Sequence, residues 1–357
     1  MKKILALLTA CLMIAGLFAG CGDTAADTQP AADETEAAAP TQEGTEAPSE
    51  SVSADAGGSL VIYASDDLRN TGVEQFREAY PGIEVEVVTA GADELCRKIL
   101  EESEMPRCDV LLGSADILAA CTECFEAYVC ANDAFIDEEN KDADDLWIGT
   151  AVQTAVIIYN KTLIDEAEVP ATWRGLCDES LKGRIAYASP AESGTAYTQL
   201  CTMLFSQDTI EDGWALLENF AANLDGSIQD SADACHELVA AGEYAVGITT
   251  EQAAAQYAEN ENIGYVYPMK SSAVPEGAAL IRNCANEENA RLFIDFITGM
   301  EYQSGQCAQP GWRSVRSDVT PEELCALDAL DLGDYDYVYA AGSRETILEQ
   351  WNGLLAG

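Results

Sequence analysis

The fold is decided by the stretch LVIYASDDLRNTGVEQFREAYPGIEVEVV, residues 60–88. Its apolar opening, residues 60–64, predicts a buried strand. Residues 70–80 then carry apolar side chains at the spacing of one helix face, and a Pro-Gly pair ends that helix. The alternating residues 83–88 predict a second strand. This order of strand, helix and strand is the unit from which parallel sheets with covering helices are built.

The same rhythm continues along the chain. A helix is expected over residues 93–103 and a third strand over 109–113, with later helices beginning near Thr195 and spanning 286–300. Further strands are expected over 152–159, 184–187, 244–248, 264–267 and 277–281. Strands that alternate with helices predict an α/β fold.

The N-terminus has the pattern of an export signal. Lys2 and Lys3 precede the largely apolar residues 4–18, and small residues lead to Cys21. We expect residues 1–20 to be a signal peptide, the alternative being an anchor that stays in the membrane. The stretch Phe-Ala-Gly-Cys that ends at Cys21 resembles a bacterial lipobox, which implies cleavage before Cys21 and attachment of lipid to its sulfur. Acyl chains on Cys21 would hold the protein at a membrane surface.

Residues 21–58 follow as an acidic tether. Residues 22–58 contain nine acids, no base and no aromatic residue. Such a segment cannot bury enough apolar surface to offset its ordering entropy, so we expect it to be disordered.

The net charge excludes some partners. The whole sequence carries a formal charge of −45, and removing the two lysines of the signal peptide and the nine acids of the tether leaves −38 on the remaining residues. A body this acidic does not neutralise nucleic-acid phosphates or adhere to an anionic bilayer. We therefore expect no nucleic-acid partner and membrane association through lipid on Cys21 alone.

Cysteine usage leaves alternatives open. Eleven cysteines follow Cys21, an odd number that cannot all pair within the chain. Cys121 and Cys124, with Cys108 and Cys130 nearby, have spacing that could hold zinc, but no second CxxC pair accompanies them. We favour small buried thiols or one local disulfide, and we expect no metal and no cofactor.

Several segments together resemble the type 2 periplasmic binding proteins, in the branch that binds ferric iron or phosphorylated and phosphonate solutes. The resemblance runs from about Leu60 to Trp351. The segments that carry it are YAS at 63–65, DVLLGS at 109–114, IYNK at 158–161, PATW at 170–173, LKGRIA at 181–186, PAESGTAY at 190–197, GEYAVGIT at 242–249 and NARLFIDF at 289–296. Their order and spacing, rather than any single segment, make the match specific.

The resemblance implies two lobes, each a mostly parallel sheet flanked by helices, joined by hinge-crossing strands near 152–160 and 275–281. Lobe 1 is expected to comprise residues 59–153 with 274–318, and lobe 2 residues 154–273. The C-terminal segment, 319–357, is expected to pack across both lobes. The implied function is that of an extracytoplasmic solute-binding lipoprotein that closes over its ligand and delivers it to the permease of an ABC importer. We expect it to act as a monomer at the outer face of the cell membrane.

Candidate ligand contacts follow the predicted strands. In open α/β sheets ligands bind where loops leave the carboxyl ends of strands. Backbone N–H groups and hydroxyls at a helix start can hold an anionic oxygen, although Ser and Thr also favour such positions as plain helix caps. The expected ligand-binding residues are Ser65, Ser114, Ser193, Gly194, Thr195, Thr249, Thr250 and Glu251.

The cargo remains open between three classes. The Ser-Gly-Thr turn at residues 193–195 favours a phosphate, phosphonate or carboxylate group. A polyamine is the alternative suggested by the overall charge, with Glu251, Asp66, Asp67 or Glu192 as its acidic partners. Ferric iron or an iron chelate is a third. The iron-binding relatives carry adjacent tyrosines where this chain has a Thr-Thr-Glu sequence beginning at Thr249.

Tyr257 and His236 are not expected to contact ligand, and they bear on whether the protein could be an enzyme. Tyr257 has no tyrosine neighbour and is expected on a helix face, and His236, the one histidine, on a helix surface. A Ser-His-Asp triad would depend on His236, and no Gly-x-Ser-x-Gly elbow is present. We therefore expect that the protein is not an enzyme. A lipoprotein that senses ligand for a membrane kinase would share this fold.

Overall fold

The computed structural model describes residues 56–65, 68, 71–321 and 324–356, all within one unit of the chain, Val52–Gly357. The predicted signal peptide, Cys21, most of the tether, Asp66 and Asp67 lie outside the described residues. Within these ranges, no helix combines the length and apolar character that crossing a bilayer requires.

The described strands confirm the predicted α/β rhythm. Their bounds are β1 Gly58–Ser65, β2 Ile83–Ala90, β3 Val110–Ser114, β4 Ile148–Asn160, β5 Ile185–Ala186, β6 Val246–Thr250, β7 Ile263–Val266 and β8 Ala273–Leu280. The α-helices are α1 Val73–Ala79, α2 Ala92–Glu101, α3 Ala115–Ala119, α4 Gly194–Phe205, α5 Ile210–Leu224, α6 Ala232–Ala241, α7 Glu251–Ala255, α8 Glu287–Ile297, α9 Met300–Gln306, α10 Tyr337–Gly342 and α11 Arg344–Leu355.

The strands form a mixed sheet in the order β2-β1-β3-β8-β4-β6-β5, with β7 paired to β4. The β2-β1-β3 strands are mutually parallel, as are β5 and β6. The pairs that involve β4 and β8 are antiparallel. The parallel arrangement we expected therefore applies to the outer strands, and the strands at the crossing run against their neighbours.

Strand β4 connects the two halves of the sheet. Its residues Ile148–Thr154 pair with β8, whereas Ala155–Asn160 pair with β6 and β7. Most of its 13 side chains are buried, which explains why the sequence is an almost continuous run of β-branched and small residues. The change of partner between Thr154 and Ala155 marks the point where the chain passes from one half of the sheet to the other.

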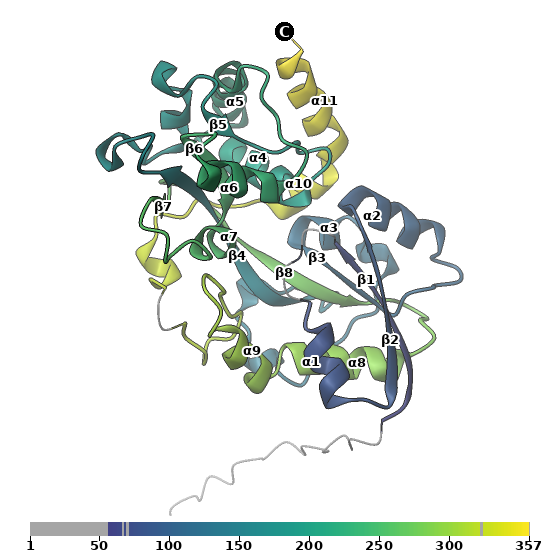
Figure 1. Ribbon diagram of the computed structural model, residues 1–357. Helices are drawn as coiled ribbons and strands as arrows, with labels where there is room; N and C mark the ends of the chain where they lie inside the picture. The colour runs from purple at the N-terminus through teal and green to yellow at the C-terminus, as the bar shows by residue number, and fades with distance from the viewer. Residues whose placement is uncertain (1–55, 66–67, 69–70, 322–323, 357) are drawn as a thin grey trace, which may run out of the picture. The chain divides into compact units, whose positions relative to one another are not determined.

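Helices cover both faces of the first half of the sheet (Figure 1). On one face Phe76 of α1 packs edge-on against Phe293 of α8, in one apolar cluster. On the other face Leu95 of α2 and Leu118 of α3 belong to a second cluster. We refer to the body built on these two clusters as lobe 1.

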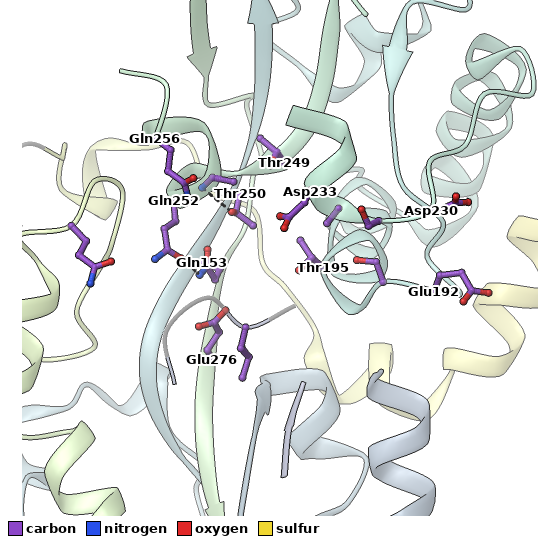
Figure 2. A pocket seen from close by; sticks show the side chains of 16 residues that line it. Gln153, Glu192, Thr195, Asp230, Asp233, Thr249, Thr250, Gln252, Gln256 and Glu276 are labelled. Carbon is purple, nitrogen blue, oxygen red and sulfur yellow. Dashed lines mark hydrogen bonds between the residues drawn. The ribbon is translucent and has the colours of Figure 1, made fainter. Parts of the chain in front are cut away.

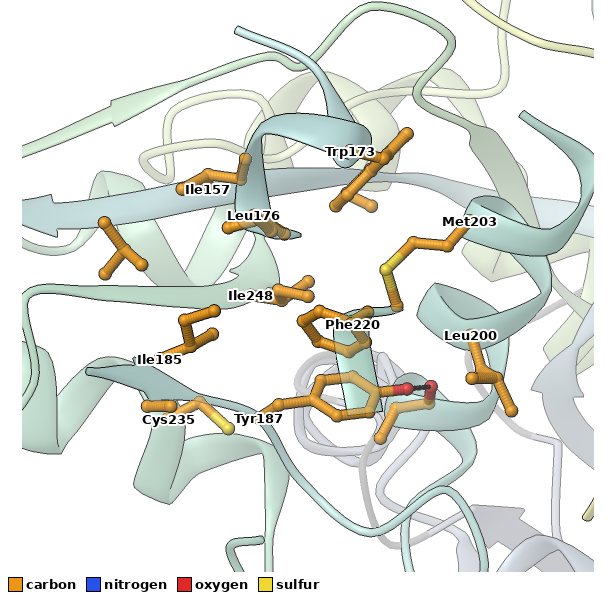
Figure 3. Close-up of a cluster of buried hydrophobic side chains, with 14 of the residues drawn as sticks. Ile157, Trp173, Leu176, Ile185, Tyr187, Leu200, Met203, Phe220, Cys235 and Ile248 are labelled. Carbon is orange, nitrogen blue, oxygen red and sulfur yellow. Dashed lines mark hydrogen bonds between the residues drawn. The ribbon is translucent and has the colours of Figure 1, made fainter. Parts of the chain in front are cut away.

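A third apolar cluster, which we call the core of lobe 2, surrounds the second half of β4 (Figure 3). Ile157 of β4, Ile248 of β6 and Leu200 of α4 contribute to it. Helix α5 approaches α4 closely at Gly213, where a Cβ atom would collide with the backbone carbonyl oxygen of Leu204. Only glycine permits this approach.

The C-terminal segment contacts elements of both lobes. Trp351 of α11 is fully buried and stacks on Phe220 of α5 in lobe 2. Arg344, at the start of α11, forms an ion pair with Asp93 of α2 in lobe 1, and its guanidinium lies 4.0 Å from the ring centre of Tyr197 in α4. The domain boundaries expected from sequence remain predictions.

The eleven described cysteines are free thiols. Six of them, Cys108, Cys121, Cys124, Cys130, Cys201 and Cys235, are buried, and Cys325 is exposed. Burial raises the pKa of Cys130 to about 11 and that of Cys201 to about 12. Thiols with such pKa values stay protonated and unreactive at neutral pH, so these residues act as small apolar side chains.

Candidate functional site

A cavity of about 570 Å³ opens between elements of the two lobes. Lobe 2 contributes the starts of α4, α6 and α7, while Gln153 of β4 and Glu276 of β8 lie at the strand crossing. Figure 2 shows these two side chains on one side of the open space and Thr195 and Asp233 on the other. Polar side chains dominate the lining, which suits a small hydrophilic solute.

Three helices begin at this cavity, and each is capped by its own hydroxyl. The side chains of Ser193, Ser231 and Thr250 accept hydrogen bonds from the backbone N–H groups at the third position of α4, α6 and α7, each at 3.2 Å. This is the standard N-cap bond of Ser and Thr. The other N–H groups of each first turn have no acceptor inside their helix and can donate to a ligand.

The predicted contact residues divide into two groups. Ser193, Thr195, Thr249 and Thr250 line the cavity, and Ser114 lines a smaller pocket beside it. Ser65 and Gly194 are buried, and neither belongs to these linings. The structure therefore brings the starts of α4 and α7 to one cavity, while contact of any of these residues with a ligand remains a prediction.

Glu251 has a different position from the one we expected. It is 1 % exposed and forms a two-pronged ion pair with Arg313, with Nε to Oε2 at 2.5 Å and Nη2 to Oε1 at 3.0 Å. Tyr267 also donates its hydroxyl to this carboxylate, and burial together with that bond raises the pKa of Tyr267. Because its oxygens already hold these partners and lie outside the cavity lining, we leave Glu251 out of the proposed ligand contacts.

The charge at the cavity is one-sided. Four carboxylates line it, from Glu192, Asp230, Asp233 and Glu276. Among the described lining residues there is no lysine or arginine. Glu192 and Asp230 precede the N-caps of α4 and α6, and Asp233 lies in the first turn of α6. These acids lie close to the positive ends of the two helices, which attract negative charge. The cavity therefore has amide donors and carboxylate acceptors close together.

His236 is not on a helix surface, and that expectation was wrong. It is 4 % exposed, and its Nδ1 lies 3.3 Å from the hydroxyl oxygen of Thr249. The ring of Tyr257 packs at 5.8 Å between ring centres. Helix α6 packs against β6 on this side, which buries the histidine behind a residue that lines the cavity.

Sequence reasoning missed the lining residues contributed by strands. Gln153 donates from its amide nitrogen to the side-chain oxygen of Gln252 at 3.1 Å, which links β4 to α7 beside the cavity. Glu276 lies on β8, where Ala151 of β4 is its pairing partner. Polar residues inside otherwise apolar strands were the available signal, but only the strand register shows which face they occupy.

Comparison with known proteins identifies the family of this chain. Residues 118–328 match the family described as bacterial extracellular solute-binding protein. The chain belongs to this family. Binding of a small solute and partnership with an ABC transporter follow from that membership, and the family is extracellular or periplasmic. Its members are binding proteins rather than enzymes.

Individual relatives are distant but cover most of the chain. A putative 2-aminoethylphosphonate-binding periplasmic protein of Salmonella typhimurium is 25% identical over 278 residues, which are 74% of this chain and 81% of that protein. The Fe(3+)-binding periplasmic protein of Serratia marcescens is 26% identical over 268 residues, covering 71% and 77%.

Solved structures confirm the two-lobed fold of this solute-binding protein. The periplasmic binding protein AfuA of Actinobacillus pleuropneumoniae, solved with fructose-6-phosphate, superposes with a TM-score of 0.74 at 24% identity, covering 84% of this chain and 99% of the other. Iron-bound HitA of Pseudomonas aeruginosa gives 0.72 at 21% identity, covering 83% and 99%. At these identities the likeness concerns the fold.

Proposed function

We propose that this protein is the lipid-anchored capture component of an ABC importer, and that its cargo carries both an oxyanion and an ammonium group. The observation that carries the proposal is the lining of one cavity by the starts of α4 and α6 together with four carboxylates. Backbone amides at helix starts suit a phosphonate, phosphate or carboxylate. The carboxylates suit an ammonium group.

Neither charge alone fits this lining as well. An anion without an ammonium group would meet the carboxylates of Glu192 and Asp230, which directly precede the N-caps of α4 and α6. A polyamine offers no hydrogen-bond acceptor to the positive ends of α4 and α6. A solute that carries both charges satisfies both sets of groups. A relative of this chain is named for such a solute, 2-aminoethylphosphonate.

Iron receives less support from the lining. The described residues around the cavity include no tyrosine. In the described part of the chain, no group of three His, Cys, Asp or Glu residues is arranged to hold a metal ion. A zwitterionic solute needs neither feature, so we place it ahead of ferric iron as the cargo.

Capture is proposed to occur by closure of the two lobes about β4. The strand changes partner from β8 to β6 between Thr154 and Ala155, so a small change of backbone angles there would rotate one half of the sheet against the other. Glu276, on the lobe 1 side, would then approach the starts of α4 and α6 in lobe 2.

Closure predicts a change that scattering can measure. We expect the radius of gyration of the Cys21→Ala protein, from small-angle X-ray scattering, to fall when 2-aminoethylphosphonate is added to saturation. The same solute added to urea-unfolded protein provides the control and should change nothing. An unchanged radius at concentrations where binding is saturated would contradict closure.

The anchor is proposed to be lipid on Cys21. We expect the Cys21→Ala change to move the protein from the membrane fraction to the soluble fraction, because the remaining chain is strongly acidic and would not adhere to anionic lipid. Fractionation with labelled fatty acid measures both events. Membrane retention and labelling of the Cys21→Ala protein would reject Cys21 as the site. Co-purification with a permease, rather than with a membrane kinase, would distinguish import from sensing.

A further inference from the structure

A second, smaller pocket lies beside the main cavity. Its volume is about 40 Å³, and it lies between β4 and the start of α4. It shares Gln153, Thr195 and Glu276 with the larger cavity, so the two are continuous at these residues. A single water molecule needs roughly 10–15 Å³ of such space, so the small pocket has room for a group of about two or three heavy atoms.

Two buried polar atoms that line this small pocket have no hydrogen-bond partner within the described chain. They are the hydroxyl oxygen of Thr154 and the amide nitrogen of Gln199, on side chains that are 1 % and 2 % exposed. Buried polar groups in folded proteins are nearly always hydrogen-bonded, because burial without a partner is unfavourable. Two such groups in one pocket point to an external partner.

The neighbouring hydroxyls show that these two atoms are exceptional. Ser114 donates to the Asp116 carboxylate at 2.6 Å, and Thr202 and Ser272 share a hydrogen bond of 2.6 Å deep in the same region. Local packing has therefore satisfied the polar groups around the pocket. The two that remain are positioned at the junction of β4 and α4, where the lobes meet.

The chemistry of the lining selects the missing partner. The Gln199 nitrogen donates, so the ligand atom must accept a hydrogen bond, which an ammonium group cannot do. The Thr154 hydroxyl can donate or accept, and both it and the Gln199 amide are neutral, so they would not compensate for the burial of a charged oxygen. A neutral hydroxyl group meets both demands, because its oxygen accepts from Gln199 while its proton is donated to the hydroxyl oxygen of Thr154.

We propose that the small pocket is a subsite for a hydroxyl group on the transported solute. This inference rests on the proposed function, since it adds a hydroxyl to a solute already held by its charged groups in the main cavity. The solute class that follows is a hydroxylated amino-phosphonate, amino-phosphate or amino acid rather than a bare alkyl chain.

The test compares two compounds that differ by one hydroxyl, 3-aminopropylphosphonate and 3-amino-2-hydroxypropylphosphonate. Calorimetry on the Cys21→Ala protein is expected to show about tenfold tighter binding of the hydroxylated compound, the size of effect that two neutral hydrogen bonds produce. In Thr154→Val and Gln199→Leu variants we expect that preference to shrink to about twofold or less, with binding of the parent compound retained.

Stability and a control variant separate this role from a structural one. Thr154→Val has nearly the same shape and removes a buried group without a partner, so its melting temperature without ligand should not fall. Gln256→Leu changes the main cavity only and should keep the tenfold preference. Equal binding of the two compounds, or an undiminished preference in both variants, would overturn the subsite alone. Failure of both compounds to bind would overturn the proposed cargo and the subsite with it.

Discussion

Replacing Arg313 by methionine is expected to lower the free energy of unfolding by about 3–5 kcal/mol, the usual cost of leaving one member of a buried ion pair without its partner. Arg313 is 3 % exposed, and its guanidinium meets the Glu251 carboxylate through two bonds. It also donates to the backbone carbonyl of Cys325 at 2.8 Å. Methionine fills a similar volume, so the loss would come mainly from the uncompensated charge of Glu251.

The position of this pair makes the effect relevant to function. Glu251 begins α7 directly after Thr250, which lines the cavity. The carbonyl oxygen of Arg313 accepts from the backbone N–H of Val152, in the part of β4 that pairs with β8. The pair therefore holds a helix of lobe 2 against the crossing strand, and its loss should also weaken ligand binding.

Urea unfolding followed by circular dichroism measures the change, with two matched controls. Arg291→Met removes an exposed ion pair with Glu287 and should cost less than about 1 kcal/mol. The double variant Arg313→Met with Glu251→Met removes both charges and should recover much of the lost stability. A single Arg313→Met variant as stable as the parent protein would show that Glu251 is not held as described.

The sheet was predictable because its signals are local. Residues 60–88 contain a buried strand, an amphipathic helix and an alternating strand, and the structure has β1, α1 and β2 at these places. The run over residues 152–159 likewise marks β4, because a strand covered on both faces needs apolar side chains throughout. Its antiparallel pairing with β8 and β6 depends on partners about a hundred residues away, which local pattern does not specify.

The sequence could indicate those residues of the candidate site that lie where a strand ends and a helix begins. Ser193 was expected where a strand gives way to a helix, and it caps α4. Thr250 was expected only as a residue that follows a strand, and the structure shows that it also caps α7. The role of Glu251 could not be predicted from sequence, because it depends on an ion pair with an arginine 62 positions along the chain. His236 was misplaced for the same reason, since its burial follows from the packing of α6 on β6.

The affinity of the protein for its cargo is expected to depend on both charged groups of the solute. We expect 2-aminoethylphosphonate to bind about tenfold to a hundredfold more tightly than ethylphosphonate, which lacks the ammonium group, or ethylamine, which lacks the phosphonate. A hydrogen bond to a charged group contributes about 1.5–3 kcal/mol, and each incomplete compound leaves one set of cavity groups without such a bond.

Two substitutions assign the ammonium group to its partners. Glu192→Gln and Asp233→Asn keep the size of the side chains and remove carboxylates that line the cavity. Combined, they should reduce the advantage of 2-aminoethylphosphonate over ethylphosphonate by about tenfold, while ethylphosphonate itself binds no worse because a repulsive charge has been removed. An unchanged advantage would mean that other groups hold the ammonium.

Calorimetric titration of the parent protein with 2-aminoethylphosphonate, ethylphosphonate, ethylamine and ferric citrate tests the central claim most directly. We expect saturable binding that is tightest for 2-aminoethylphosphonate and at least about tenfold weaker for each compound that carries only one of its two charged groups. Equal or tighter binding of ethylphosphonate or ethylamine, or saturable binding of ferric citrate alone, would contradict it.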